Sequence, residues 1–232
     1  MIKLFQYPAL WHLPNPSPFC MKLQTYLRMA KIPFEIVTIL DPRKAPKGKL
    51  PYIEDDNRII SDSDFIIDYL KQKFNDSLDS TLTPLQKGQA LVVQRMLEEH
   101  FYWVFVYSRW IDEVNWPTIK KAFFGKMPFL LRCFIPEMLR KNVKRTLFAQ
   151  GIGRHSREDI YQLGLKDLKA LAVILNDQLF LMGSEPTSID ACCFAFLANV
   201  LGTPGVSPLK DFVQAERSFV DYCARMNERF YS

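Results

Sequence analysis

The spacing of hydrophobic positions changes along the chain and divides it into two parts. In residues 1–75, runs of β-branched and aromatic residues predict strands at 2–6 and 34–40 and a hairpin at 52–60. Between them the apolar residues recur at helical spacing, as do those after the hairpin. The helix faces are Cys20, Leu23, Leu27 and Ala30, and then Ile66, Leu70 and Phe74. This order, β-α-β then β-β-α, predicts a small α/β domain.

Strand patterns end at residue 75. Residues 76–84 are polar and turn-forming and end in proline, which predicts a linker. From residue 85 to 232 the pattern is helical, with one long helix expected from Gln86 to Trp110. Prolines at 128 and 136 are expected to break up the Phe-rich stretch that follows. Helix-start signals recur at Ser156–Asp159 and Thr187–Asp190. The second part is therefore predicted to be an all-α domain.

Composition narrows the class of protein. The chain has 48% hydrophobic and 24% charged residues, as a globular protein does. Its longest apolar stretch, 191–201, is about half of what a membrane-spanning helix needs, and the N-terminus does not resemble a secretory signal. The five cysteines include no C-x-x-C pair, and no histidine stands at metal-ligand spacing from them. We expect a cytoplasmic protein without a transmembrane segment or a bound metal.

The net charge of +5 is concentrated in one segment. Between Pro117 and Gln150 there are eight basic residues and one acid, and phenylalanines and leucines lie among them. Such a basic patch at 120–145 suits an anionic partner or a membrane surface. It equally suits a helical hairpin that buries its Phe face and leaves its basic face in solvent. The segment lacks a nucleic-acid-binding motif, so no nucleic-acid partner is expected.

The strongest local signal for chemistry is Ser17-Pro18-Phe19-Cys20. Ser17 is predicted to cap a helix that begins at Pro18 and carries Cys20 in its first turn. Unpaired amides and the helix dipole favour negative charge there, so a thiolate would be stabilised. The alternative is that Ser17 only caps the helix and Cys20 only packs.

Two further segments offer binding groups. Leu50-Pro51 precedes a strand, and a cis bond there would leave the Leu50 backbone open to an extended ligand. Ser61-Asp62-Ser63-Asp64 opens a helix, where hydroxyls and amides can hold a carboxylate and an acid can hold an ammonium group. Each segment also has an ordinary structural explanation, as a strand-initial proline and as helix-capping residues.

Taken together, these segments resemble the glutathione S-transferase family. The α/β unit with S-P-F-C, L-P and D-S at its three junctions resembles that family's thioredoxin-like domain, and the helical part resembles its C-terminal domain. Thr187-x-x-Asp190 matches the family's S/T-x-x-D folding motif. The strings PSPFCMKLQTYLRMA, GKLPYIEDD, FIIDYL, RMLEEHFYW, QGIGRHS and PTSIDACCFAFLA resemble the branch of the failed-axon-connections proteins, the metaxins and their bacterial relatives.

The resemblance implies roles for individual residues. Ser17 stands where the family keeps its activating Ser or Cys, Leu50 would offer its backbone to glutathione, and Pro51 would be cis. Asp62 and Ser63 match the pair that holds the γ-glutamyl group. Redox members of the family have Cys at the position of Ser17, so dithiol chemistry is not expected, and a monothiol route would need Cys20 to be exposed.

The resemblance also implies an electrophile pocket beside the long helix, with Tyr102, Tyr107 and Arg109 as candidate lining residues, although a helix-bundle core explains these aromatics equally well. The expected function is glutathione binding and conjugation to a small electrophile, with a homodimer as one arrangement. The alternative is a non-catalytic, metaxin-like interaction module that docks a protein partner or a membrane surface.

Overall fold

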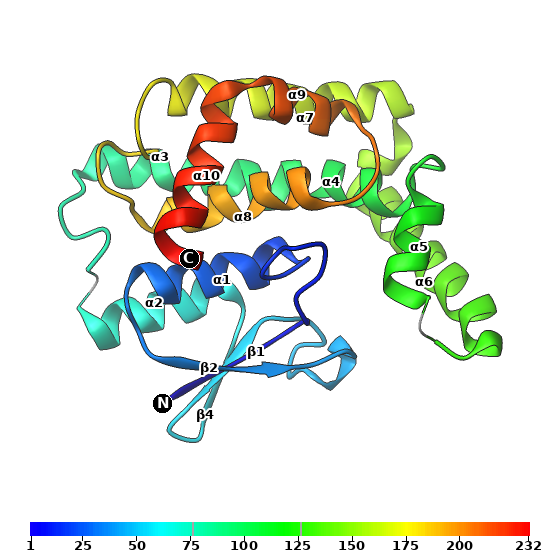
Figure 1. Cartoon of the computed structure of the whole chain (residues 1–232), viewed down its shortest axis with the longest axis horizontal. Helices are drawn as coiled ribbons and strands as arrows, with labels where there is room; N and C mark the ends of the chain where they lie inside the picture. The colour runs from blue at the N-terminus through cyan, green and yellow to red at the C-terminus, as the bar shows by residue number, and fades with distance from the viewer. Residues whose placement is uncertain (76, 126) are drawn as a thin grey trace.

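The computed structural model describes residues 1–75, 77–125 and 127–232. A four-stranded sheet with the order β2-β1-β3-β4 forms its base (Figure 1). The strands are β1 (Ile2–Gln6), β2 (Phe34–Thr38), β3 (Tyr52–Asp55) and β4 (Arg58–Ser61). β1 is parallel to β2 and antiparallel to β3, which pairs with β4 through a turn with positive φ at Asp56 and Asn57. The predicted strands are found, although β2 ends two residues early.

Two helices, α1 (Pro18–Met29) and α2 (Ser63–Phe74), cover the sheet on the side that faces the helical domain (Figure 1). Cys20, Leu23 and Leu27 are fully buried, as their spacing predicts. Lys22 and Thr25 on other sides of α1 are buried as well, because α1 is covered by the sheet on one side and by α8 (Ser188–Gly202) on the other. The α/β domain and the helical domain therefore share one continuous apolar core.

The rest of the chain is helical. The predicted long helix is found as α3 (Pro84–Arg95), a π-helical turn (Met96–Phe101) and α4 (Tyr102–Trp110). The remaining helices are α5 (Trp116–Phe124), α6 (Phe129–Gln150), α7 (Arg157–Leu175), α8, α9 (Pro208–Ala215) and α10 (Arg217–Tyr231), with short 3₁₀ turns at Pro42–Lys44 and Ile152–Arg154. α8 is buried on all sides from Ile189 to Val200 and forms the centre of the domain.

The helix caps follow the sequence signals. Ser156 accepts the Asp159 amide at the start of α7, and Thr187 and Asp190 cap each other reciprocally at the start of α8. The expectation for Pro136 was wrong: this proline lies buried inside α6 without ending it, while Pro128 stands directly before the helix.

Within the described residues, no helix is both long and apolar enough to cross a bilayer.

Candidate functional site

Ser17 lies at the amino end of α1, beside the carboxyl end of strand β1. Its extended backbone (φ −98°, ψ 121°) and Pro18 in the first helical position start the helix. The Ser17 Oγ accepts the Cys20 amide across a long 3.5 Å, and a hydrogen bond between the Ser17 and Cys20 side chains acts to lower the pKa of the Cys20 thiol. The first turn of α1 carries no acidic side chain, so the positive end of the helix dipole is not neutralised there.

Cys20, the candidate for a monothiol route, points into the protein. It is fully buried against Ala45 and Leu50, and burial raises the pKa of its thiol to about 12. A thiol that stays protonated and has no access to solvent cannot serve as a nucleophile. The exposure that the monothiol route needs is absent, so Ser17 is the better candidate at this helix end.

Three side chains from two domains hold the loop that presents Ser17. The Asn15 Oδ1 accepts the Ser17 amide at 3.0 Å, and the Asn15 Nδ2 donates to the Tyr7 carbonyl at 2.7 Å. From α4, Arg109 Nη1 donates to the Pro16 carbonyl at 2.6 Å and Nη2 to the Asn199 Oδ1 at 3.1 Å. Asn199 on α8 in turn donates to the Asn15 carbonyl at 3.2 Å. Ser17 is therefore positioned by a buried polar network.

Leu50 and Pro51 lie at the same edge of the sheet. Their peptide bond is cis, and Leu50 packs on Cys20, directly behind the amino end of α1. Within residues 1–75, 77–125 and 127–232, the Leu50 backbone amide and carbonyl take part in no hydrogen bond. Both groups are therefore available to an extended ligand.

Asp62 and Ser63 adjoin Leu50 and Pro51 through the sheet. Tyr52 pairs with Ser61 in the β3–β4 ladder, so the residues that precede β3 and those that follow β4 are neighbours. Asp62 caps α2 with an unusual backbone (φ 84°, ψ 127°), a strained conformation of the kind that often occurs at functional sites. Ser63 is only 4% exposed, and its hydroxyl forms no hydrogen bond with any described residue.

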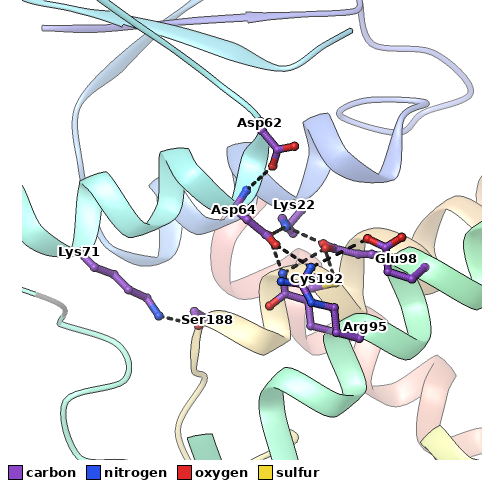
Figure 2. Close-up of polar contacts among 10 residues, drawn as sticks. Lys22, Asp62, Asp64, Lys71, Arg95, Glu98, Ser188 and Cys192 are labelled. Atoms are coloured by element: carbon purple, nitrogen blue, oxygen red, sulfur yellow. Dashed lines mark hydrogen bonds and ion pairs between the residues drawn. The ribbon is translucent and has the colours of Figure 1, made fainter. Parts of the chain in front are cut away.

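A buried lysine, Lys22, links the α/β domain to the helical domain through ion pairs (Figure 2). The Lys22 Nζ on α1 lies 2.5 Å from the Asp64 carboxylate on α2 and 2.5 Å from Glu98 in the π-helical turn. Arg95 adds a second ion pair to Asp64 at 3.1 Å. Burial alone would raise the pKa of Asp64, but Lys22 and Arg95 outweigh burial and hold it below its usual range. This network fixes α2, and with it Ser63, relative to α1.

The candidate pocket residues on α4 face different surroundings. The Tyr102 ring packs edge-on against Phe19 at 5.0 Å, close to Ser17. Tyr107 packs against Tyr161 of α7 instead. Arg109 is 6% exposed and is occupied by Pro16, Asn199 and Thr203, so it supports the Ser17 loop; it also lines a small pocket with Ser108, Asn115 and Thr203. The structure therefore brings Tyr102 and Arg109 to the Ser17 end of the site, and Tyr107 lies away from it.

Sequence reasoning missed several residues of this site. Trp11 lies in a tight turn with positive φ at Trp11 and His12, and its ring contacts Phe123 edge-on at 5.2 Å and lies under the Arg109 guanidinium. Asn15, Lys22 and Asn199 also gave no sequence signal, because their partners lie far away in the chain. Within the described residues, no group of three or more His, Cys, Asp or Glu side chains is placed to hold a metal ion.

Comparisons with known proteins place this geometry in a family. The family model of the glutathione S-transferase N-terminal domain matches residues 18–115, and that of the C-terminal domain matches residues 164–226. The isoprene-epoxide–glutathione S-transferase of Rhodococcus sp. (strain AD45) is 34% identical over 99% of both chains. Failed axon connections of Drosophila melanogaster is 31% identical over the whole of this chain, which spans 58% of that protein. Mouse metaxin-1 is 30% identical over 86% of this chain and 65% of its own length.

Solved structures agree on the fold. The beta-etherase LigF from Sphingobium sp. strain SYK-6 superposes with a TM-score of 0.68 at 19% identity, covering 97% of this chain and 94% of that one. A glutathione S-transferase of Ceriporiopsis subvermispora in complex with glutathione has a TM-score of 0.61 at 18% identity and covers all of this chain and 98% of its own. With two matching domains in the family's order and a relative similar over its full length, the chain belongs to the glutathione S-transferase family.

Proposed function

We propose that this protein binds glutathione along the edge formed by Ser17, Leu50 and Ser63 and stabilises its thiolate for conjugation to a small electrophile. The observation that carries the proposal is the set of unpaired polar groups at this edge. The Leu50 backbone and the Ser63 hydroxyl lack a hydrogen-bond partner among the described residues. The Ser17 hydroxyl, which contacts the Cys20 side chain, belongs to a third segment at the same end of the sheet.

Each group suits one part of the tripeptide. The Ser63 hydroxyl and the amide groups at the start of α2 can hold the γ-glutamyl carboxylate, and the exposed Asp62 carboxylate can hold its ammonium group. The Leu50 amide and carbonyl can pair with the cysteinyl backbone, as an added strand would. This arrangement brings the cysteinyl sulfur towards Ser17.

The chemistry then follows from the position of Ser17. The thiol of glutathione loses its proton to solvent, and the resulting thiolate accepts the Ser17 Oγ–H while lying at the positive end of α1. The sulfur attacks an electrophilic carbon. If the electrophile is an epoxide, a C–S bond forms, one C–O bond of the ring breaks, and the oxygen takes a proton from water.

An apolar epoxide is the electrophile class we favour. The relative that is similar over its full length is named for glutathione transfer to an isoprene epoxide. In this chain, the Phe19–Tyr102 pair provides an aromatic, apolar surface next to Ser17. The cysteines of the described residues are all free, which agrees with a reducing compartment, and we assign the protein to the cytoplasm.

The test is conjugation of glutathione to an isoprene epoxide, followed by mass spectrometry of the product. We expect Ser17→Ala to lower kcat on the order of 100-fold, as the loss of one preorganised donor does. Cys20→Ala is the matched control in the same helical turn and should leave turnover close to that of the wild type. A wild type that conjugates no faster than free glutathione would contradict the proposal, and a loss of turnover in Cys20→Ala alone would reassign the site to Cys20.

A non-catalytic role as an interaction module is the second candidate. Failed axon connections and metaxin-1 are nearly as similar in identity as the transferase, although this chain spans only part of their length. Binding of glutathione without any conjugation would favour this second role.

A further inference from the structure

The outer part of α6 exposes apolar side chains that a monomeric soluble protein would normally bury. Phe129, Leu130 and Phe134 are 69%, 71% and 74% exposed, and Leu131 and Met138 are also exposed. We call these five residues the α6 apolar tip. An apolar cluster of this kind, bordered by polar residues, usually marks an interaction surface.

The basic segment 120–145 has two interpretations, either a contact with an anionic partner or membrane, or a helical hairpin that buries its phenylalanines. The exposure of the α6 apolar tip bears on this choice. A hairpin that buries its phenylalanines accounts for Phe123 and Phe124 on α5, which pack with Trp110 and Trp116. It does not account for α6, where Pro136 and Leu147 are the buried positions and the phenylalanines face solvent. Within the described part of the chain, the Phe129 and Phe148 rings lie under the guanidinium groups of Arg132 and Arg154, and no ring of α6 packs against another aromatic ring.

Basic side chains follow the α6 apolar tip along the same face of the helix. Leu130, Phe134, Met138, Lys141 and Arg145 follow each other at spacings of three or four residues, on the side opposite Pro136 and Leu147. Lys144 is exposed beside this stripe, and Arg132 is exposed near the start of the helix. We call Arg132, Lys141, Lys144 and Arg145 the α6 basic band; Lys126 lies outside the described residues.

Other charges of the segment are engaged within the protein. Lys120 pairs with Glu137 at 2.8 Å, which neutralises the acid on α6. Arg140 donates to the carbonyls of Trp110 and Ile111 and pairs with Glu113, so it anchors α6 to α4. The remaining accessible charge of this face is thus cationic.

The position of the tip favours one kind of partner. α5 and the first half of α6 project from one end of the helical domain, at the right of Figure 1. A projecting helix end with exposed aromatics suits insertion into an interface better than capture of a peptide in a groove. Apolar side chains flanked by cations match the layers of an anionic bilayer, with acyl chains beneath phosphate headgroups.

We propose that the α6 apolar tip and basic band dock this protein onto anionic lipid bilayers. The apolar tip enters the boundary between headgroups and acyl chains, and the basic band stays among the lipid phosphates. This function lies apart from the glutathione site and goes beyond conjugation, since α6 contributes none of the residues proposed to bind glutathione.

The test uses phosphatidylcholine vesicles with and without phosphatidylglycerol, at low and high salt. Cys133 provides a direct reporter, because it is exposed beside the tip while the other four cysteines are buried. A polarity-sensitive dye on Cys133 should change its emission, and the protein should float with the anionic vesicles at low salt, with much weaker binding at high salt.

Two variants separate the contributions. Replacing Leu130 and Phe134 by Ser should lower the vesicle partition coefficient about tenfold or more. Replacing Lys141, Lys144 and Arg145 by Gln should lower it on the order of 100-fold at low salt. Leu85→Ser and Arg217→Gln change similarly exposed residues elsewhere (72% and 91% exposed) and should bind as the wild type does. Thermal unfolding confirms that each variant is folded.

Three results would overturn the proposal. One is a wild type that does not bind anionic vesicles at low salt. Another is equal binding to neutral and anionic vesicles that the basic variant leaves unchanged. The third is self-association that the Leu130 and Phe134 variant abolishes while vesicle binding is absent, which would make α6 an interface between two copies of this chain.

Discussion

Arg109 on α4 donates a 2.6 Å hydrogen bond from Nη1 to the carbonyl of Pro16, the residue directly before Ser17. The guanidinium is buried without an acidic partner among the described residues, and burial lowers its pKa to about 9. It is therefore still charged at neutral pH. Arg109, a buried cation of the helical domain, therefore holds the loop that presents Ser17, the candidate catalytic residue of the α/β domain.

Replacing Arg109 by Met tests this relationship. The carbonyl of Pro16 and the amide oxygen of Asn199 would lose their donor, at about 1–3 kcal/mol each, while removal of a buried cation offsets part of the cost. We expect a net loss of about 1–3 kcal/mol in the free energy of unfolding, measured with urea, together with slower conjugation. The exposed Arg217→Met is the matched control. Unchanged stability and turnover in Arg109→Met would show that the Ser17 loop does not depend on this contact.

The ion pairs of Asp64 predict a pH dependence of stability. Because Lys22 and Arg95 hold the pKa of Asp64 below its ordinary value of about 4, the ionised carboxylate favours the folded state. That contribution is complete above the ordinary pKa and is lost as the pH falls below it, through the pKa of the folded protein.

We therefore expect the free energy of unfolding, measured with urea, to fall less between neutral pH and about pH 3 in Asp64→Asn than in the wild type. Asp68→Asn changes an exposed acid on the same helix and should follow the wild type. A parallel loss in Asp64→Asn and wild type between the two pH values would mean that the Lys22 network contributes nothing to acid stability.

The amino-terminal caps of α8 and α7 provide a matched pair. The carboxylate of Asp190 is fully buried and accepts the Leu181 amide, the Thr187 amide and hydroxyl, and the Tyr222 hydroxyl. At the surface, Ser156 caps α7 and the Asp159 carboxylate accepts the Ser156 hydroxyl. Asp190→Ala should therefore cost about 3–5 kcal/mol, since several buried donors lose their acceptor, and Asp159→Ala about 1 kcal/mol. Equal losses in urea unfolding would contradict the difference in burial on which this prediction rests.

Local patterns explain why so much of the fold could be predicted. The start of α1 at Pro18 and the β3–β4 turn depend on residues close together in the chain, and their signals are present in the sequence. Lys22 shows the opposite case. It was not expected to be buried, because its partner Glu98 lies 76 positions away and α8 covers its helix. Arg109 reaches Pro16 across 93 positions, which no spacing rule detects.

The α6 residues show a second limit of sequence patterns. The amphipathic spacing in 120–145 indicates helices, but it does not reveal which face another element covers. Pro136 and Leu147 are buried and Phe134 is exposed because α6 projects from the domain and contacts it on one side only. For the same reason the candidate pocket residue Tyr107 could not be separated from Tyr102 and Arg109 before their neighbours were known.

Calorimetric titration of the wild type and Ser63→Ala with glutathione measures directly whether the protein binds glutathione at this site. We expect the wild type to bind glutathione at millimolar or lower concentrations. We expect Ser63→Ala to bind about 10- to 100-fold more weakly, because a charge-assisted hydrogen bond worth about 1.5–3 kcal/mol is lost. No binding heat in the wild type at millimolar glutathione, confirmed at a second temperature, would contradict the claim that Ser17, Leu50 and Ser63 form a glutathione site.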